Sequence, residues 1–402
     1  MSDARSQGSV PLVTATAKDD PERLSGLTLF LVDEAVSRGG LLARTIARLE
    51  QLECDLLATK ELGPEERHRI EKQCTRDRDF LPGTAPATVL VMQDLAAVDG
   101  HGVSGGADGE RQSVLEARIN RFLRQRLPSG LAQGRKGSFV HVSRNSQEAW
   151  QNVLIALPEQ ADTLLAEARR RAKAYRTPFP VVRRLTPHVN RAKVELVDYH
   201  GTPAVYKTFR IGNERFLQRE VLAHVELSRQ LEQIPRALAY GENWILLPFI
   251  EDTLGSAFRQ LRLLPLPMAK QLIRFLEALY DAGYAHLDFS LKNALFDRAG
   301  QLRVIDFEFL HRYDKRPASF EESYDIIGLP ADFAGDLPKG SIIRTYDSRL
   351  RKNTGLSLKS LREDPDWKQH MTRSLFFATT SLPRRIAWQG YRWWLRLQAR
   401  SG

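Results

Sequence analysis

Apolar positions in the first part of the chain follow a strand pattern, then a helix pattern, then a strand pattern again. Residues 27–32 are a continuous apolar run of the kind found in buried strands, and leucine and isoleucine recur at roughly helical spacing over 41–52. Apolar runs at 54–62, 85–93 and 137–143 predict further strands. The order of these segments indicates an α+β domain.

Two more segments complete this first domain. Residues 99–113 combine glycine with polar side chains, which predicts a flexible surface loop, and they lack the GxGxxG register of a nucleotide-binding turn. Residues 145–157 begin like a capped helix. We therefore expect the α+β domain to cover 27–160 and a disordered tail to precede it at 1–26.

The second half of the chain predicts strands first and mostly helices afterwards. A basic helix at 161–178, ending at a proline, is expected to connect the two domains. The expected strands are 193–199, 204–209, 243–250 and 302–307, and the expected helices are 213–231, with Asn213 as N-cap, and 267–284. This order predicts a two-lobed α+β domain over 179–345 and a helical extension over 346–402.

Composition limits the class of protein and its partners. Hydrophobic residues make up 42% and charged residues 27% of the chain, which is typical of a soluble globular protein, and no apolar run reaches the ~18–20 residues that span a bilayer. The polar N-terminus has no signal-peptide core, so we expect a cytoplasmic protein. Cys54 and Cys74 match no metal or redox spacing and are expected to be buried thiols. The net charge of +10 favours a polyanionic partner.

The end of the chain concentrates basic and aromatic residues. On a helical wheel, Arg385, Arg392, Arg396 and Arg400 fall within an arc of roughly 80°, and tryptophan, tyrosine and leucine fill most of the rest. This arrangement is typical of helices at anionic bilayer surfaces, so 384–402 predicts a peripheral membrane contact on the inner face. The alternative is a helix packed on its own domain with its arginines in solvent. Nucleic-acid binding is not expected, because no groove-reading motif accompanies the arginines.

Five polar residues of the second domain are of the types that phosphate transfer from ATP requires. Lys207 lies in an apolar strand, where an unpaired ammonium would be costly, and Glu220 follows it by 13 residues on a predicted helix as a natural counter-ion. Asp288 precedes Asn293 by five residues, and Asp306 follows an apolar strand. Such a site needs a lysine on the phosphates, Asp and Asn oxygens on Mg²⁺, and a carboxylate near the acceptor hydroxyl.

The same residues carry a resemblance to the protein-kinase-like superfamily. "AVYK" resembles the family's strand-three "VAIK", "HLDFSLKN" its "HRDxxxxN" catalytic loop, and "GLPADFAGD" its "GTPxYxAPE", while "IDFE" stands where "DFG" stands. The resemblance implies that Lys207 contacts the phosphates of ATP and that Glu220 holds Lys207. It also implies that Asp288 is the catalytic base and that Asn293 and Asp306 bind Mg²⁺.

The resemblance covers about 180–335 and departs from the family at the loop that covers the phosphates. The segment 185–197 has no glycine where protein kinases carry GxGxxG. Asn190, Arg191 and Lys193 could contact phosphate in its place, or they could form an exposed basic hairpin. Lys193 is therefore a candidate nucleotide-binding residue.

Three further departures bear on regulation. Leu287 replaces the arginine that docks a phosphorylated activation loop, so that form of switching should be absent. Ser290 replaces the lysine two residues after the base in Ser/Thr protein kinases, and Lys292 is the candidate substitute. Glu308 replaces the DFG glycine, so the flip that glycine permits at positive φ should be harder. These features are more similar to bacterial lipopolysaccharide-core and sugar kinases, or to RIO-type kinases, than to regulated protein kinases.

The first domain resembles nucleoside diphosphate kinases over 27–160, which implies a ferredoxin-like fold. "TLFLVDEAVSRG" is similar to that family's first strand and "KPDAVxRG", and "RDFLPG" to its "RPFFPG". Val32 stands at the position of the active-site lysine, and His141 matches the phosphate-accepting histidine only if the preceding strand is realigned. We therefore expect an inactive domain with a structural, regulatory or dimerising role, in which His141 is a strand histidine.

The sequence thus predicts an α+β protein with a ferredoxin-like domain, a two-lobed protein-kinase-like domain and a basic, aromatic C-terminal helix. The first functional hypothesis is an ATP- and Mg²⁺-dependent kinase that phosphorylates a hydroxyl of a membrane-associated glycolipid or sugar from the cytoplasmic face. The alternatives are a Ser/Thr protein kinase active without loop phosphorylation, and a nucleotide-binding pseudokinase scaffold. The first domain could also mediate a homo-oligomer.

Overall fold

The structure is a computed structural model, described here for residues 26–75, 86–98, 108–128, 131, 138–186, 191–255, 263–338, 345–383, 386–387 and 390–391. It is an α+β structure whose described sheets are antiparallel. It divides into two compact units, one ending at Arg176 and the other beginning at Thr177. Within the described part of the chain, no helix is both long and apolar enough to cross a membrane.

The first unit is built on a four-stranded sheet in the order β2-β3-β1-β4. Every residue of β1 and β3 is buried. These two strands occupy the middle of the sheet and are covered on both faces, which explains why their sequences are mostly apolar rather than alternating. The strands are β1 (Leu27–Asp33), β2 (Cys54–Glu61), β3 (Pro86–Asp94) and β4 (Val140–Val142).

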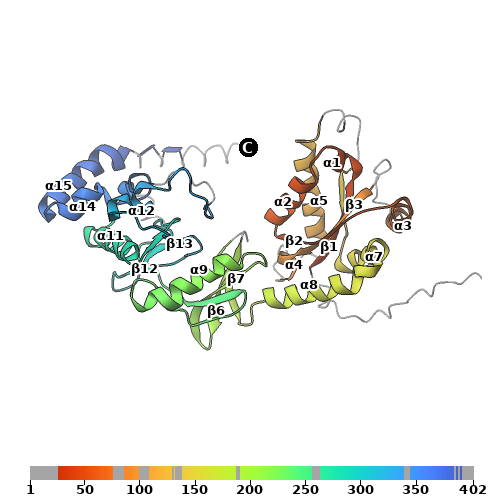
Figure 1. The fold of residues 1–402 in the computed structure, drawn as a ribbon, viewed down its shortest axis with the longest axis horizontal. Coiled ribbons are helices and arrows are strands. Elements are labelled where there is room, and N and C mark those ends of the chain that lie inside the picture. Colours follow the sequence, from red (N-terminus) through yellow and green to blue (C-terminus); the bar gives the residue numbers. More distant parts are fainter. Residues whose placement is uncertain are drawn as a thin grey trace, which may run out of the picture. The chain divides into compact units, whose positions relative to one another are not determined.

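Helices cover both faces of this sheet (Figure 1). The apolar cluster on one face joins Phe30 of β1 to α2 and α5, and the cluster on the other face joins Leu31 to α3, α7 and α8. The helices of this unit are α1 (Glu34–Arg38), α2 (Leu42–Gln51), α3 (Pro64–Thr75), α4 (Leu95–Val98), α5 (Asp108–Arg124), α7 (Ser146–Ala156) and α8 (Ala161–Tyr175).

Two expectations for this unit change in the structure. Helix α5 begins at Asp108, so the loop expected over 99–113 ends earlier, and 99–107 lie outside the described residues. Helix α8 buries one side against the sheet, and its Ala168 carbonyl accepts a hydrogen bond from Gln93 Nε2 at 2.9 Å, so this helix belongs to the first unit. The cap of α7 is confirmed, because the Asn145 side chain accepts a hydrogen bond from the amide three residues on at 2.8 Å.

The second unit opens with a five-stranded antiparallel sheet in the order β5-β6-β7-β9-β8. Strand β7 lies at its centre, and Lys207 of β7 stands opposite Val194 of β6 and Ile245 of β9. The strands are β5 (Val181–Arg184), β6 (Ala192–Tyr199), β7 (Thr202–Phe209), β8 (Ala239–Tyr240) and β9 (Trp244–Pro248).

The helix predicted over 213–231 follows β7 but is not uniform. Helix α9 (Glu214–Val221) runs into a π-helical turn (Leu222–Glu226) and then a 3₁₀ turn (Leu227–Arg229). Asn213 occupies the N-cap position, yet its side chain makes no capping hydrogen bond. The predicted element is therefore confirmed in place and extent, but its cap is not.

Two small strand ladders in the rest of this unit bring distant segments together. Strands β10 (Tyr284–His286) and β13 (Leu310–Arg312) pair, as do β11 (Ala294–Phe296) and β12 (Leu302–Val304). The segment 287–293 links β10 to β11, and 305–309 links β12 to β13. Because the ladders are antiparallel pairs, these two segments lie side by side.

Helices make up most of what remains of the second unit (Figure 1). Helix α11 lies at the centre of its apolar core, with Leu272, Leu276 and Leu279 almost fully buried. The helices are α11 (Leu266–Asp281), α12 (Tyr324–Ile327), α13 (Lys352–Thr354), α14 (Leu358–Glu363) and α15 (Asp366–Phe376), with a π-helical turn (Phe377–Ser381) after α15.

Candidate functional site

Lys207 lies at the centre of the candidate site. Its ammonium nitrogen is buried and lies 2.7 Å from Glu220 Oε1, 2.8 Å from Asp306 Oδ1 and 2.9 Å from Glu308 Oε1. Burial alone would lower the pKa of Lys207, but the three carboxylates outweigh burial and raise that pKa well above its usual value. Lys207 therefore stays charged, and Glu220 is its counter-ion as the sequence indicates.

Glu220 is held from two sides. Its fully buried side chain projects from α9, with Oε1 on Lys207 and Oε2 at 3.1 Å from His224 Nε2. His224 Nδ1 lies 2.6 Å from Pro235 O, and because a carbonyl oxygen only accepts, this nitrogen is the donor. Burial acts to raise the pKa of Glu220, but Lys207 and His224 outweigh it and hold that pKa below its usual range.

Asp306 combines an unusual backbone with a partly exposed carboxylate. Its φ of 67° is in the left-handed region that non-glycine residues avoid, which costs about 1–3 kcal/mol. Ile305 N, next to it, donates to Asn293 O at 2.9 Å, so the neighbouring segment restrains this backbone. The Asp306 side chain is 41% exposed, which places it between the buried ion pairs and solvent.

Side chains from the helical part of the second unit hold the main chain at the start of the loop 287–293. His286 N donates to Asp325 Oδ2 at 3.0 Å, and Arg349 Nη1 donates to Leu287 O at 3.3 Å. Both partners come from the helical part of the unit. The position of the loop is therefore set by residues that lie after it in the sequence.

Within this loop, Asn293 and Asp288 are linked and Lys292 stands apart. Asn293 Nδ2 donates to Asp288 O at 3.1 Å, which leaves the Asn293 amide oxygen as the atom suited to a metal. Asp288 is partly buried, whereas Lys292 is exposed and makes none of the ion pairs that join the other site residues.

Two basic residues considered for phosphate binding have other partners. Lys193 is fully buried, with its Nζ 3.3 Å from Glu195 Oε2, so its ammonium is not presented to a nucleotide. Arg191 forms an ion pair with Glu308. The burial of Lys193 and its pairing with Glu195 do not favour the expected contact with nucleotide, which stays a prediction. Asn190 lies outside the described residues.

Arg215 and Arg219, which sequence reasoning did not single out, tie α9 to Asp336, the last residue of the "GLPADFAGD" motif. Arg219 of α9 donates to Glu308 O at 3.1 Å and pairs with Asp336 at 2.7 Å, and Arg215 of α9 pairs with Asp336 at 3.0 Å. Asp336 lies 117 residues after Arg219, so no local pattern indicates this pair. These contacts hold the helix that carries Glu220 against the segments that follow Asp306.

The hard oxygens of the site suit Mg²⁺ at Asp306 and Asn293. Oxygens of Glu220, Asp306 and Glu308 all lie within 4.8 Å of one another, but the Lys207 ammonium contacts all three and is the cation of that group. Asp306 offers a partly exposed carboxylate, of which Oδ1 already lies on Lys207, and Asn293 an amide oxygen, and both are ligand types that Mg²⁺ prefers. The residues therefore fit the expected metal.

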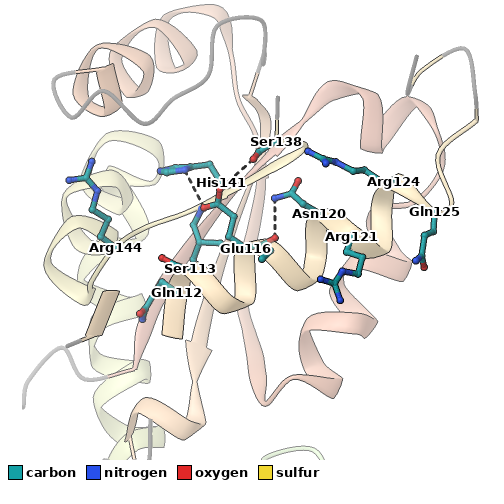
Figure 2. Close-up of a pocket in the computed structure, with 12 residues that line it drawn as sticks. Gln112, Ser113, Glu116, Asn120, Arg121, Arg124, Gln125, Ser138, His141 and Arg144 are labelled. Atoms are coloured by element: carbon teal, nitrogen blue, oxygen red, sulfur yellow. Dashed lines mark hydrogen bonds and ion pairs between the residues drawn. The ribbon is translucent and has the colours of Figure 1, made fainter. Parts of the chain in front are cut away.

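A pocket of about 790 Å³ lies in the first unit, lined by residues of α5 and around β4 (Figure 2). His141 is the middle residue of β4, as expected for a strand histidine, and its Nδ1 lies 3.4 Å from Glu116 Oε2. Arg121 and Arg144 are exposed at the same pocket. Val32 is fully buried in β1 and supplies no charge for a phosphate.

A scan against protein-family models finds no match for this chain, and a search of curated proteins finds no similar sequence.

Proposed function

We propose that this protein is a kinase that transfers the γ-phosphate of ATP to a hydroxyl, and that the second unit holds its active site. One observation carries the proposal. Lys207 and Asp306, separated by 99 residues, meet through their side chains beside Glu220, in a region where Asp306 adopts a costly backbone. The buried Lys207 contacts Asp306, whose side chain is partly exposed and whose backbone is strained. This combination of a charged buried group and a strained partner is typical of functional sites, so it supports a functional role over a purely structural one.

Each residue has a role in the proposed reaction. Lys207, kept charged by its carboxylate neighbours, would bind the phosphates of ATP, and Glu220 would hold Lys207 in place. Asp288 would accept the proton of the acceptor hydroxyl, because it lies on the loop that also carries Asn293. Asn293 and Asp306 would hold Mg²⁺, which supplies charge neutralisation of the phosphates when bound.

The proposed acceptor is a membrane-associated glycolipid or sugar, reached from the cytoplasmic face. Two observations support a site that works without a phosphorylated loop, as the proposed acceptor requires and as an unswitched protein kinase would share. Leu287 stands where regulated protein kinases carry an arginine, and Asp336 pairs with two arginines of α9. Asp336 supplies the negative charge that a phosphorylated residue would otherwise bring to the arginines of α9, so the site needs no phosphorylated loop. A protein hydroxyl as acceptor is the competing outcome of the test below.

The first unit is proposed as a non-catalytic, ferredoxin-like domain that supports assembly. The antiparallel strand order β2-β3-β1-β4 supports that fold, and the helices on the second face of the sheet are additions to it. The buried Val32 supports the absence of catalysis, since it cannot bind phosphate by charge.

The test is transfer of label from γ-labelled ATP in parallel reactions with membrane lipid extract and with lysate protein. The proposed kinase labels lipid, and Asp288→Asn lowers the rate at least ~10²-fold. Asp281→Asn, at the exposed end of α11, is the matched control and should keep the wild-type rate. Label in protein bands alone would replace the glycolipid acceptor with a protein. Binding of Mg–ATP without transfer to either would show a nucleotide-binding scaffold instead.

A further inference from the structure

Helix α15 has a face that attaches it to the second unit. Gln369 Nε2 donates to Leu361 O at 3.1 Å and to Asp364 O at 2.7 Å, and Arg373 donates to Leu264 O. Gln369 and Arg373 are the buried residues of this helix and lie within about 40° of each other on the helical wheel. The opposite face of α15 therefore points away from the core.

That opposite face carries a row of large apolar side chains. Trp367, Met371 and Leu375, here called the α15 row, recur every four residues and are centred about 180° from the attached face. Their exposed fractions are 67%, 61% and 65%. Beyond the π-helical turn, Leu382 and Ile386 are also exposed. A contiguous exposed apolar row of this kind marks a contact surface rather than scattered surface hydrophobics.

The sequence that carries the α15 row and continues after it has charged side chains of one sign. From Trp367 to the end of the sequence there is no aspartate or glutamate. The three carboxylates just before it are paired with lysines: Glu363 with Lys359 at 4.0 Å, Asp364 with Lys368 at 2.6 Å and Asp366 with Lys270 at 2.7 Å. On α15 itself, Lys368 is paired with Asp364 and Arg373 is buried on the attached face, so the surplus of positive charge comes from the residues that follow. These are Arg384, Arg385, Arg392, Arg396 and Arg400, known from the sequence alone because they lie outside the described residues.

We propose that the α15 row is a docking surface for an anionic lipid bilayer. Apolar side chains beside a stretch that is only basic match the two terms of interfacial binding, which are burial of apolar area and attraction to acidic headgroups. A second copy of the chain fits less well, because a symmetric contact through this row would bring two positive stretches together. Nucleic acid would leave the row unburied. The proposal is independent of phosphate transfer.

Cosedimentation of the full chain with vesicles tests the surface. Wild type should bind vesicles of phosphatidylcholine with phosphatidylglycerol, bind phosphatidylcholine alone more weakly, and lose affinity as salt rises. The variant Trp367→Gln, Met371→Gln, Leu375→Gln should bind the mixed vesicles at least ~10-fold more weakly. Its thermal unfolding should match wild type, because all three side chains are mostly exposed.

A matched control and three outcomes decide whether the α15 row binds the bilayer. Leu154→Gln with Val182→Gln removes exposed apolar side chains from α7 and β5, and this pair should bind vesicles as wild type does. Equal vesicle binding by the triple variant and wild type, or no preference of wild type for anionic vesicles, overturns the proposal. A lipid-free dimer that the triple variant abolishes, seen by sedimentation equilibrium without vesicle binding, assigns the surface to a second copy and also overturns it.

Discussion

The Lys207 ammonium and the Asp306 carboxylate lie 2.8 Å apart, although 99 residues separate them in the sequence. Lys207 belongs to the central strand of a sheet, and Asp306 to a segment between two short ladders. Their contact joins the sheet to the helical part of the second unit. The whole candidate site depends on it, since Glu220 and Glu308 meet at the same ammonium.

Replacing Lys207 by methionine tests how much this contact contributes to folding. The change leaves the fully buried Glu220 without its lysine and removes one of the two cations that contact Glu308. We therefore expect the free energy of unfolding to fall by about 3–5 kcal/mol in urea titrations. Lys270→Met, which breaks the exposed pair with Asp366, is the control and should cost about 1 kcal/mol or less. Equal losses for the two variants would show that the buried cluster contributes nothing special.

Glu308 gives the site a surplus of negative charge. Three carboxylates surround Lys207, and Arg191 offsets only one of them. We therefore expect Glu308→Gln to tighten ATP binding in the absence of Mg²⁺ by about 5-fold or more, measured by calorimetry. Glu363→Gln, at an exposed ion pair on α14, should leave the affinity unchanged. An unaltered affinity in Glu308→Gln would mean that its charge does not reach the phosphates.

Asp336 is expected to order the segment 328–338. Partial burial acts to raise the pKa of Asp336, but hydrogen bonds from Arg215 and Arg219 outweigh burial and hold that pKa below its usual value. Asp336→Asn weakens both pairs, so hydrogen exchange in peptides covering 328–338 should rise while global stability falls by only about 1 kcal/mol.

The Asp336 contacts also have a pH dependence with a defined sign. A lowered carboxylate pKa stabilises the fold above the unfolded-state pKa, and this contribution is lost as pH falls through the folded-state pKa. Acidification should therefore speed exchange in 328–338 before the protein unfolds. The exposed Asp332→Asn, in the same segment, is the control. Identical exchange in Asp336→Asn and wild type would contradict the role of Asp336.

The burial of His286 should make the free energy of unfolding depend on pH between pH 8 and 5.5. Burial lowers the pKa of His286 below 6.5, although the carboxylates of Asp325, Asp306 and Asp288 act in the opposite direction. The unfolded chain thus binds the proton more readily, so the free energy of unfolding should decrease as pH falls through 6.5.

The measurement for His286 is the slope of the unfolding midpoint against pH. His286→Gln should flatten this slope, whatever its effect on stability at pH 8. His370→Gln, on the exposed side of α15, should keep the wild-type slope. A slope that survives His286→Gln would assign the pH dependence to other groups.

The sequence predicts those contacts of the site that follow from the types of residue and their order along the chain. Lys207 in an apolar strand requires a counter-ion, and Glu220 on the next helix supplies it. The role of Lys193 depends on its environment rather than on its residue type. Lys193 and Glu195 are two residues apart on β6 and so share one face, where they are buried as a pair. That spacing is a signal that was present in the sequence.

Contacts made by separate segments could not be predicted. Arg219 reaches Asp336 and Glu308 only because the strand ladders and α9 fold beside one another, and no pattern along the chain encodes that approach. The end of the loop at Asp108 was missed for a local reason, since Asp and Gly at the start of α5 are common in loops.

His224 limits the ways in which this site could be inhibited. Its ring is fixed between Glu220 and the Pro235 carbonyl, so α9 is secured from the side opposite Lys207. Compounds that act by pushing such a helix outward would first have to break a buried network. For the proposed kinase, selective ligands would therefore be designed to fit the site as it stands, with Glu308, where the "DFG" motif that "IDFE" resembles has glycine, as the distinguishing anchor.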